Sequence, residues 1–371
     1  MSLTLKIAFL TEFLYRRDFS FSGNTLAVEE KDKLKRNQMA LAEQNLSSKT
    51  AKHEIEGHSK NRYKLLSKIS QTTMSSVYLA IDKSTGEKVI LKFLANTYCT
   101  NSSMRKRFNR EANLGKKINH PNVVQIRAKG LIKKRPFILI DYINGQTLDD
   151  LAKQKPLSNR QCVRYLIEAA NGLDAIHSAG LVHRDIKPEN LMVGKKGRLQ
   201  ITDLGLMTHY GTIVDKLTAT GAIILSPLYA SPEQARGQNV DWRSDIYSLG
   251  ATFYYLVTGK HPFVGQSPVD TLLLHISAPL TPPSVHNPQL PQELCNVITR
   301  MLSKDPTERY ANCKKLVQDL RAIKLKAPQD SGMTIKFQPQ EPRRTQGLNT
   351  LLQAFFISLA LVATMFLVRL F

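Results

Sequence analysis

The amino-acid sequence predicts an α+β fold in which a strand-rich part comes first and a helical part follows. Short apolar runs bounded by charged and turn residues occur before Asn144, and such runs are typical of strands. From Ser158 onward, apolar residues recur at spacings of three and four, which is typical of helices. A separate apolar stretch, 351–368, predicts one further helix near the C-terminal end.

Three segments carry the strand prediction. Residues 77–80 (Val-Tyr-Leu-Ala) and 88–94 (Lys-Val-Ile-Leu-Lys-Phe-Leu) have the composition of strands, and Lys92 lies near the end of the second one. Residues 137–143 form a short apolar strand that ends at Asn144-Gly145. We expect this last strand to lead into a connection between two parts of the fold.

The helix prediction begins at Ser158. Apolar residues follow it at helical spacing, namely Val163, Leu166, Ile167, Ala170, Leu173 and Ile176. Gly180 comes directly after this run and is expected to stop the helix. Further along, Pro279, Pro282 and Pro283 are expected to interrupt helices without indicating a second domain.

Two polar motifs carry the clearest chemistry. Residues 183–190 are His-Arg-Asp-Ile-Lys-Pro-Glu-Asn, and residues 203–205 are Asp-Leu-Gly. Asp185, Asn190 and Asp203 are hard oxygen donors, which Mg²⁺ shares with substrate phosphates. The first motif matches a loop in which the Asp accepts a proton from a substrate hydroxyl and the Asn holds Mg²⁺. The pattern predicts phosphoryl transfer, and the alternative of a turn with a capping Asn is disfavoured because further motifs surround it in order.

In these motifs and their order, the segment from Tyr63 to Leu320 resembles the protein kinases, specifically the bacterial membrane-tethered Ser/Thr kinases of eukaryotic (Hanks) type. The resemblance implies a two-lobed protein kinase fold, with a small β-rich N-lobe and a larger helical C-lobe, that uses ATP and Mg²⁺. The site residues that it implies are, for catalysis, Asp185, Lys187, Lys92 and Glu111, and, for the metal, Asn190 and Asp203.

The resemblance also gives each catalytic residue a role. Asp185 is the base, and Lys187 stabilises the charge on the transferred phosphate. Lys92 pairs with the α- and β-phosphates of ATP and forms an ion pair with Glu111, which marks the assembled state of the enzyme.

The phosphate-covering loop departs from the family pattern G-x-G-x-x-G-x-V. Ser70, Thr72 and Ser75 occupy the three glycine positions. Glycine permits positive φ and lets backbone N–H groups approach phosphate, so we expect these replacements to stiffen and narrow the lid over ATP. Their hydroxyls are able to compensate in part by donating to phosphate oxygens. The expected nucleotide contacts are Ser70, Ser75, Val77 and Lys92, with Asp141 and Ile143 in the connection between the lobes.

The segment 203–233 resembles an activation segment that ends in Ser-Pro-Glu. Its candidate phosphorylation sites, each of which equally suits an ordinary polar loop, are Thr212, Thr218 and Thr220. Arg184 is placed to receive such a phosphate. Ser226, followed by Pro227, lies where the family has a substrate-facing Thr-Pro, and Leu225 replaces a glycine there.

Three further residues have structural roles by resemblance. Asp245, in the segment 241–250, is expected to hold the backbone of the catalytic loop. Arg309 is expected to pair with Glu233 at the end of the activation segment. We expect His183 and Leu204 to pack between the lobes and to take no part in the chemistry.

The substrate class follows from the same motifs. Lys187 and the residues around it match the Ser/Thr-specific branch, so we expect protein Ser and Thr hydroxyls as substrates, together with autophosphorylation. Small-molecule kinases share the catalytic residues but lack the Ser-Pro-Glu anchor. The glycine-free loop leaves one alternative open, a membrane-tethered pseudokinase that acts as an adaptor. The resemblance also allows a homodimer.

The C-terminal apolar stretch predicts a transmembrane helix over 350–369. At ~1.5 Å per residue its length approaches the thickness of a bilayer core, and the polar residues within 351–368 are Gln353, Ser358 and Thr364. Basic residues precede it and favour a single-pass membrane protein with a cytoplasmic kinase domain; they are Lys336, Arg343 and Arg344. The alternative is a hydrophobic helix that docks on a partner protein.

The net charge of +22 bears on partners. Beside an anionic leaflet this charge holds the domain near the lipid within a Debye length of ~8 Å. Nucleic-acid binding is the competing use of a basic chain, but no recognised module is present, so we expect no nucleic-acid partner. The predicted organisation is an N-terminal extension (1–60), a kinase domain (61–323), a basic and polar linker (324–349) and the transmembrane helix (350–369).

The N-terminal extension and the cysteines carry little information. The opening from Leu3 to Leu14 is interrupted by Lys6 and Glu12 and lacks the features of a secretory signal. An amphipathic surface helix and a true start at Met39 both stay open. The cysteines have no close pairing or metal-ligand spacing, as expected for a reducing cytosol; they are Cys99, Cys162, Cys295 and Cys313.

Overall fold

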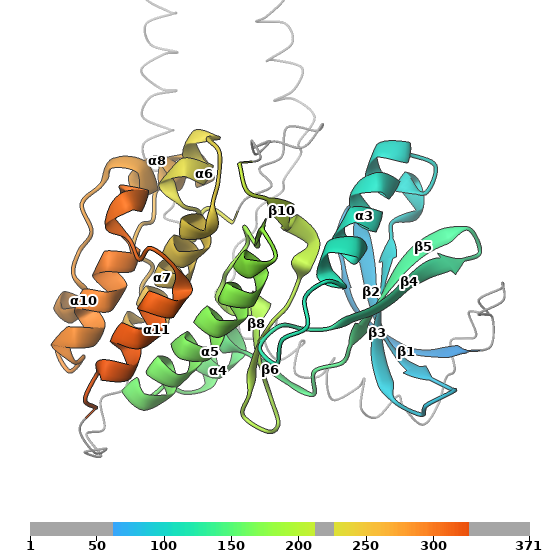
Figure 1. Cartoon of the computed structure of the whole chain (residues 1–371), viewed down its shortest axis with the longest axis horizontal. Coiled ribbons are helices and arrows are strands. Elements are labelled where there is room, and N and C mark those ends of the chain that lie inside the picture. Colours follow the sequence, from blue (N-terminus) through green and yellow to red (C-terminus); the bar gives the residue numbers. More distant parts are fainter. Residues whose placement is uncertain (1–61, 212–225, 326–371) are drawn as a thin grey trace, which may run out of the picture. The chain divides into compact units, whose positions relative to one another are not determined.

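The computed structural model describes residues 62–211 and 226–325. Within these residues a five-stranded antiparallel sheet and helix α3 (Ser102–Gly115) precede a mainly helical part (Figure 1). This arrangement confirms the predicted α+β fold with a β-rich N-lobe and a helical C-lobe.

The sheet of the N-lobe has the strand order β1-β2-β3-β5-β4. Its strands are β1 (Tyr63–Gln71), β2 (Ser75–Asp82), β3 (Lys88–Leu94), β4 (Ile126–Ile132) and β5 (Arg135–Asp141). Side chains alternate between the two faces of a strand, so Val89, Leu91 and Phe93 of β3 enter one buried cluster. Lys92 therefore points to the opposite face of the sheet.

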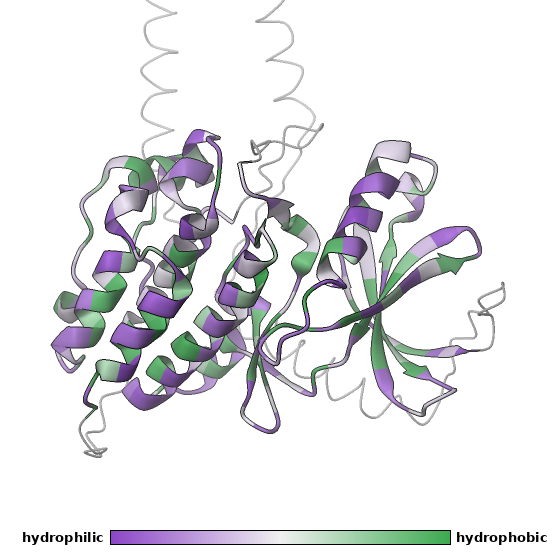
Figure 2. Ribbon diagram, viewed as in Figure 1, coloured by the Kyte–Doolittle hydropathy of each residue, from purple (hydrophilic) through white to green (hydrophobic). Residues whose placement is uncertain are grey.

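The C-lobe is built around helix α5 (Asn159–Ser178) and helix α7 (Trp242–Thr258). Its other helices are α4 (Leu148–Gln154), α6 (Pro232–Arg236), α8 (Pro268–Ser277), α9 (Pro283–His286), α10 (Gln292–Met301) and α11 (Cys313–Ala322). Hydrophilic and hydrophobic stretches alternate along α5, α10 and α11 (Figure 2). This pattern is expected of helices that bury one face.

The predicted start and end of α5 are confirmed. Ser158 is the N-cap, and a capping box with Gln161 satisfies backbone N–H groups at the first turn. Gly180 follows the helix with φ of 74°, a left-handed conformation that glycine adopts without steric cost. The chain is thereby turned directly into strand β7 (Leu181–Val182) and the catalytic loop.

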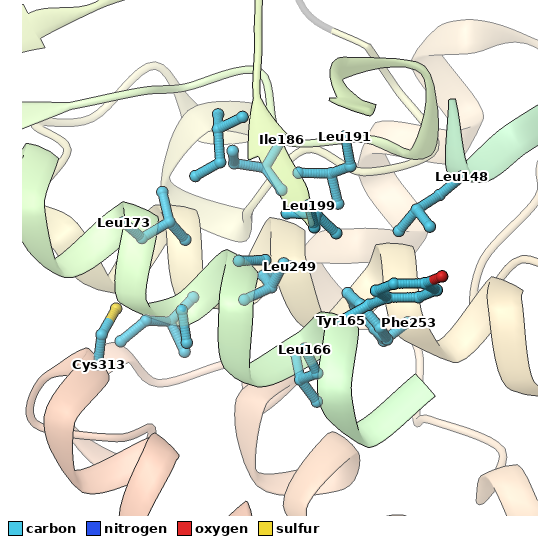
Figure 3. Packing of buried hydrophobic residues seen from close by; sticks show 14 of the residues in the cluster. Leu148, Tyr165, Leu166, Leu173, Ile186, Leu191, Leu199, Leu249, Phe253 and Cys313 are labelled. Atoms are coloured by element: carbon cyan, nitrogen blue, oxygen red, sulfur yellow. The ribbon is translucent and has the colours of Figure 1, made fainter. Parts of the chain in front are cut away.

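The buried face of α5 packs on α7 and on the segment that carries the catalytic motif. Figure 3 shows Leu166 and Leu173 of α5 with Leu249 and Phe253 of α7. Above them lie Ile186, Leu191 and Leu199, which come from the catalytic loop, β8 (Leu191–Gly194) and β9 (Leu199–Ile201). The catalytic loop therefore rests on a fully packed apolar layer, which limits its movement.

Two further short strands complete the region, β6 (Gly145–Thr147) and β10 (Thr208–His209), which pair with β8 and β7. A bridge between Val123, which lies between α3 and β4, and Ile201 joins this part of the chain to β9. Gly172 of α5 lies so close to this crossing that an added Cβ would be 2.7 Å from the carbonyl oxygen of Asn122. Only glycine allows this approach of the backbones.

Several predictions fall outside the described residues. These include the extension (1–60), the linker, the helix predicted at 350–369 and the threonines at 212, 218 and 220. Between residues 62 and 325, leaving out 212–225, no helix has both the length and the apolar character needed to cross a membrane. The predicted interruption by prolines is confirmed, because α8 ends at Ser277 and α9 starts at Pro283.

Candidate active site

Lys92 lies between two carboxylates that come from distant parts of the sequence. Its Nζ atom is 2.7 Å from Oε1 of Glu111 in α3 and 3.1 Å from Oδ1 of Asp203. Burial works against the charge on Lys92, but the two carboxylates outweigh this effect and raise its pKa. The amine therefore stays protonated and is placed to bind an anion between the lobes.

Helix α3 brings Glu111 to this position. Asn101 caps the helix by accepting the N–H of Met104. The buried face of the helix includes Phe108, Glu111 and Ala112, whose spacing of three and four places them on one side. Since Glu111 belongs to the buried face, the ion pair with Lys92 forms on the side of α3 that packs against the sheet.

Asp203 has a left-handed backbone with φ of 54°. Non-glycine residues rarely adopt this conformation, and such strain is concentrated at functional sites. Lys92 holds the pKa of the Asp203 carboxyl below its usual value, against the effect of burial. Gly205 leaves room for this contact, because a Cβ there would lie 3.1 Å from Nζ of Lys92 and 3.2 Å from Oδ1 of Asp203.

The catalytic loop gathers a carboxylate, a cation and an amide. Asn190 donates from Nδ2 to the backbone oxygen of Asp185 at 2.8 Å and to its Oδ2 at 2.9 Å. Nζ of Lys187 lies 3.0 Å from the same Oδ2. Ser226, from the far end of the activation segment, donates to Oδ1 of Asp185 at 2.7 Å and accepts from Lys187 at 2.9 Å. The Asp185 carboxylate is therefore already bonded to an alcohol with an ammonium group beside it.

Asp245 fixes the backbone of this loop, as predicted. Its Oδ2 accepts the N–H of His183 at 2.8 Å, and its Oδ1 accepts the N–H of Arg184 at 2.8 Å. Nε2 of His177 lies 2.9 Å from Oδ2, and Nδ1 of the same ring is 3.6 Å from Sγ of Cys313. Burial raises the pKa of the Cys313 thiol well above its usual value. The thiol therefore stays protonated and donates to His177, which in turn donates to Asp245.

The expected packing roles of His183 and Leu204 are confirmed. His183 is fully buried, and its Nε2 atom lies 3.1 Å from the backbone oxygen of Thr202. Leu204 belongs to the main buried cluster. Neither side chain is exposed to a substrate.

The predicted pair of Glu233 and Arg309 is also confirmed. The two nitrogens of the Arg309 fork donate to the two carboxylate oxygens at 2.7 and 2.9 Å. Burial works against the charge of Glu233, but Arg309 and the hydroxyl of Ser244 outweigh it and lower the pKa of the carboxyl. This pair holds the start of α6, just after the substrate-facing segment at Ser226.

The phosphate loop forms a tight hairpin turn without glycine. Ser70 pairs with Val77 across β1 and β2, and the turn itself consists of Thr72 to Ser75. Some of the described non-glycine residues have a positive φ, but none of the residues of this turn is among them. Thr72 Oγ1 accepts the N–H groups of Met74 at 3.2 Å and of Ser75 at 3.0 Å. The predicted hairpin is confirmed, and the Thr72 side chain explains how it forms.

In the connection between the lobes, the structure limits what Asp141 can do. Its side chain forms an ion pair with Arg127, and its backbone N–H donates to the carbonyl oxygen of Gln125 at 3.0 Å. Its side chain and its N–H group are therefore both bonded within the protein. Ile143 is buried two residues further on. The predicted strand 137–143 starts two residues earlier and ends at Asp141 in β5.

The donor set fits a magnesium ion. Both acceptors that face the Asn190 amide belong to Asp185, so Nδ2 must point to them and the amide oxygen is left to bind a cation. The side chain of Asp203 is half-exposed. Its Oδ1 atom contacts Lys92, so its Oδ2 atom is the one left to bind a cation. In the described part of the chain no three His, Cys, Asp or Glu side chains gather into a metal cluster. Such a pair of oxygens suits Mg²⁺, which takes its other ligands from phosphates and water.

Residues 63–320 match the family model of the protein kinase domain. The chain belongs to this family. A probable serine/threonine-protein kinase of Clostridium perfringens is 34% identical over 282 residues, which are 76% of this chain and 40% of the relative. The serine/threonine-protein kinase PknB of Mycolicibacterium smegmatis is 34% identical over 268 residues, which are 71% of this chain and 43% of the relative.

The chain thus spans about two fifths of the length of these curated relatives. A solved structure, the PknI kinase domain of Mycobacterium tuberculosis, is similar in fold with a TM-score of 0.54 and 23% identity. The match covers 70% of this chain and 95% of the PknI chain. The match agrees with the two-lobed kinase fold described above.

Three of the contacts of this kinase domain that were not predicted from the sequence concern the site and its support. They are the bond of Ser226 to Asp185, the turn cap by Thr72 and the contact of Cys313 with His177. Ser226 already had a signal, since its position was recognised as substrate-facing. The other two depend on side-chain geometry, and Cys313 is 136 residues from His177.

Proposed function

We propose that this chain is a protein serine/threonine kinase that transfers the γ-phosphoryl group of ATP to protein Ser and Thr hydroxyls. The observation that carries the proposal is the contact of Lys92 with Glu111 at 2.7 Å and with Asp203 at 3.1 Å. In the family this ion pair belongs to the assembled catalytic state. A pseudokinase that serves only as an adaptor has no need of this arrangement, so it is the less favoured function.

The residues perform the transfer mainly by position and charge. Asp185 accepts the proton of the substrate hydroxyl, a step that contributes typically about 10²–10⁴-fold in rate. Lys187, at 3.0 Å from that carboxylate, stabilises charge on the phosphoryl group as it passes to the hydroxyl. Lys92 orients the α- and β-phosphates. A Mg²⁺ ion held by Asn190 and Asp203 supplies further neutralisation of phosphate charge.

The contact of Ser226 supports Asp185 as the base. A general base must lie within about 2.6–3.2 Å of the group that loses the proton, and the internal alcohol of Ser226 lies 2.7 Å from Oδ1. The same carboxylate is therefore accessible to a hydroxyl group in a suitable direction. Ser and Thr are supported as the substrate class by Lys187 and by the names of the relatives.

The test combines nucleotide binding with turnover. Purified chain is heated with and without Mg²⁺ and ATP to measure the thermal shift, and is then incubated with labelled ATP to detect autophosphorylation. We expect binding and label in the unaltered chain. Asp185→Asn should keep the thermal shift and lose at least about 100-fold in label, because it removes the base. A thermal shift without label in the unaltered chain would instead support the adaptor, and full activity of Asp185→Asn would remove the assignment of the base.

We propose further that the C-terminal segment 350–369 anchors the kinase in a membrane, with the kinase domain on the cytoplasmic side. Its apolar sequence and the basic residues before it support this proposal. Cell membranes are washed with alkaline carbonate, which removes peripheral proteins. Retention of the full chain, and release of a chain that ends at residue 349, would support the anchor; release of both would favour a helix that docks on a partner protein.

A further inference from the structure

The turn of the phosphate loop is closed by a side chain. Thr72 Oγ1 accepts the N–H groups of Met74 and Ser75, and it also lies 3.3 Å from Oγ and 3.4 Å from the carbonyl oxygen of Ser75. The backbone N–H of Thr72 donates to that same carbonyl at 2.9 Å. Threonine often closes turns in this way, by bonding to backbone groups two or three residues further on.

A second tether holds the tip of the loop. The carbonyl oxygen of Met74 accepts the N–H of Ala95, which follows β3, at 2.9 Å. The turn is therefore fixed on both sides, by Thr72 within the hairpin and by Ala95 from the neighbouring strand. Its conformation does not depend on glycine at any of the three family positions.

The two N–H groups that Thr72 occupies have a function in the kinase family. The loop there covers the nucleotide phosphates, and glycines in it allow backbone N–H groups to come close to phosphate oxygens. Successive N–H groups that point to one acceptor form a small anion-binding site. In this chain the acceptor is the Thr72 hydroxyl oxygen, which carries no net charge.

We propose that the Thr72 hydroxyl competes with the phosphates of ATP for the N–H groups of Met74 and Ser75, so that residue 72 sets the affinity for the phosphate part of the nucleotide. This inference rests on the proposed kinase function. Binding of the phosphates to the loop requires the Thr72 side chain to leave both N–H groups. The adenosine part, which binds at the connection between the lobes, is not affected by this exchange.

Two variants isolate the hydroxyl. Thr72→Ala removes it and leaves a backbone that needs no positive φ, while Thr72→Ser keeps it. Thr72 is exposed, so neither change disturbs the core. Thr73→Ala is the matched control, because it removes a hydroxyl from the next residue of the same exposed turn, one that is not at a glycine position of the family pattern.

Dissociation constants are measured by titration calorimetry for ATP with Mg²⁺ and, separately, for adenosine. We expect Thr72→Ala to bind ATP roughly five- to tenfold more tightly than the unaltered chain, since two neutral hydrogen bonds no longer oppose phosphate binding. Adenosine affinity should be the same in all variants. Thr72→Ser and Thr73→Ala should both bind ATP as the unaltered chain does.

Three outcomes would overturn the inference: unchanged or weaker ATP binding by Thr72→Ala, an equal gain for adenosine, or an equal gain in Thr73→Ala. A Thr72→Ala variant that does not bind ATP at all would count as weaker binding and would also overturn the inference. Failure of the proposed function gives a different result, because tighter ATP binding by Thr72→Ala without phosphoryl transfer in any variant would reject the enzyme and retain the role of Thr72.

Discussion

Replacing Asp245 by Asn tests how the catalytic loop is held in place. The side chain is 0% exposed and accepts three N–H groups, from the backbone of His183 and Arg184 and from the ring of His177. An amide of the same shape has only one accepting oxygen. If the amide oxygen takes the place of Oδ2, the amide NH₂ group takes the place of Oδ1 and faces the N–H of Arg184. Both groups are donors, so the hydrogen bond to Arg184 is lost.

The cost of this change follows from the bonds lost. A hydrogen bond to a charged group contributes about 1.5–3 kcal/mol, and a buried donor left unsatisfied costs a further ~1–3 kcal/mol. We therefore expect Asp245→Asn to lower the free energy of unfolding by about 3 kcal/mol. Because Arg184 immediately precedes Asp185, the freed backbone also misplaces the base, and a shift of ~1 Å can reduce kcat about 100-fold.

Asp241→Asn supplies the matched control. Asp241 caps the same helix, α7, by accepting the N–H of Arg243 at 2.7 Å, and Asn caps helices as well as Asp does. Urea unfolding gives the stability of both variants, and the rate of phosphorylation with saturating ATP gives kcat. The reasoning is refuted if Asp245→Asn keeps its kcat, or if Asp241→Asn loses as much stability as Asp245→Asn.

The remaining predictions concern buried groups of the C-lobe. Arg309→Leu should lower the free energy of unfolding in urea by about 3–5 kcal/mol, because it leaves the Glu233 carboxylate buried without its partner; a loss below ~1 kcal/mol would contradict this. Burial lowers the pKa of His275 to about 3, from 6.5 in the unfolded chain, so the unfolded state binds the extra proton first as the pH falls. Stability should then drop by about 2 kcal/mol between pH 7 and pH 5 on account of this group, and His275→Gln should show a correspondingly flatter profile of unfolding free energy against pH. Cys313→Ala, which leaves Nδ1 of His177 without its donor, should cost about 1–2 kcal/mol in the same assay, whereas Cys313→Ser, which keeps a donor, should recover most of it.

Much of this site could be predicted because its residues belong to short motifs with fixed spacing. Asp185 and Asn190 are five residues apart in one loop, so their contact at 2.9 Å depends on few residues. Lys92 and Glu111 lie on adjacent elements, a strand and a helix, each with a regular pattern of burial. The resemblance to the kinase family placed both side chains, and the burial patterns of the strand and the helix agree with that placement.

The rest depends on geometry that spacing does not encode. The loop hydroxyls were expected to act on the nucleotide, whereas the Thr72 hydroxyl closes the loop on itself. This contact follows from the turn conformation and from the register of β1 and β2. The Asp141 side chain forms an ion pair with Arg127 because β4 lies next to β5 at the edge of the sheet. Both are contacts within the protein that the spacing of the motifs does not indicate.

The two halves of the site are held by different kinds of contact. The base is supported from the C-lobe by Asp245, which is fully buried, so changes there reduce stability and turnover together. The phosphate side is held by Thr72 at an exposed turn and by the half-exposed carboxylate of Asp203. Exposed hydrogen bonds contribute little to the stability of the fold, so substitutions on that side change nucleotide affinity with little effect on folding. With the proposed function, we therefore expect single substitutions in the loop to change the affinity for ATP while Asp185 keeps its position.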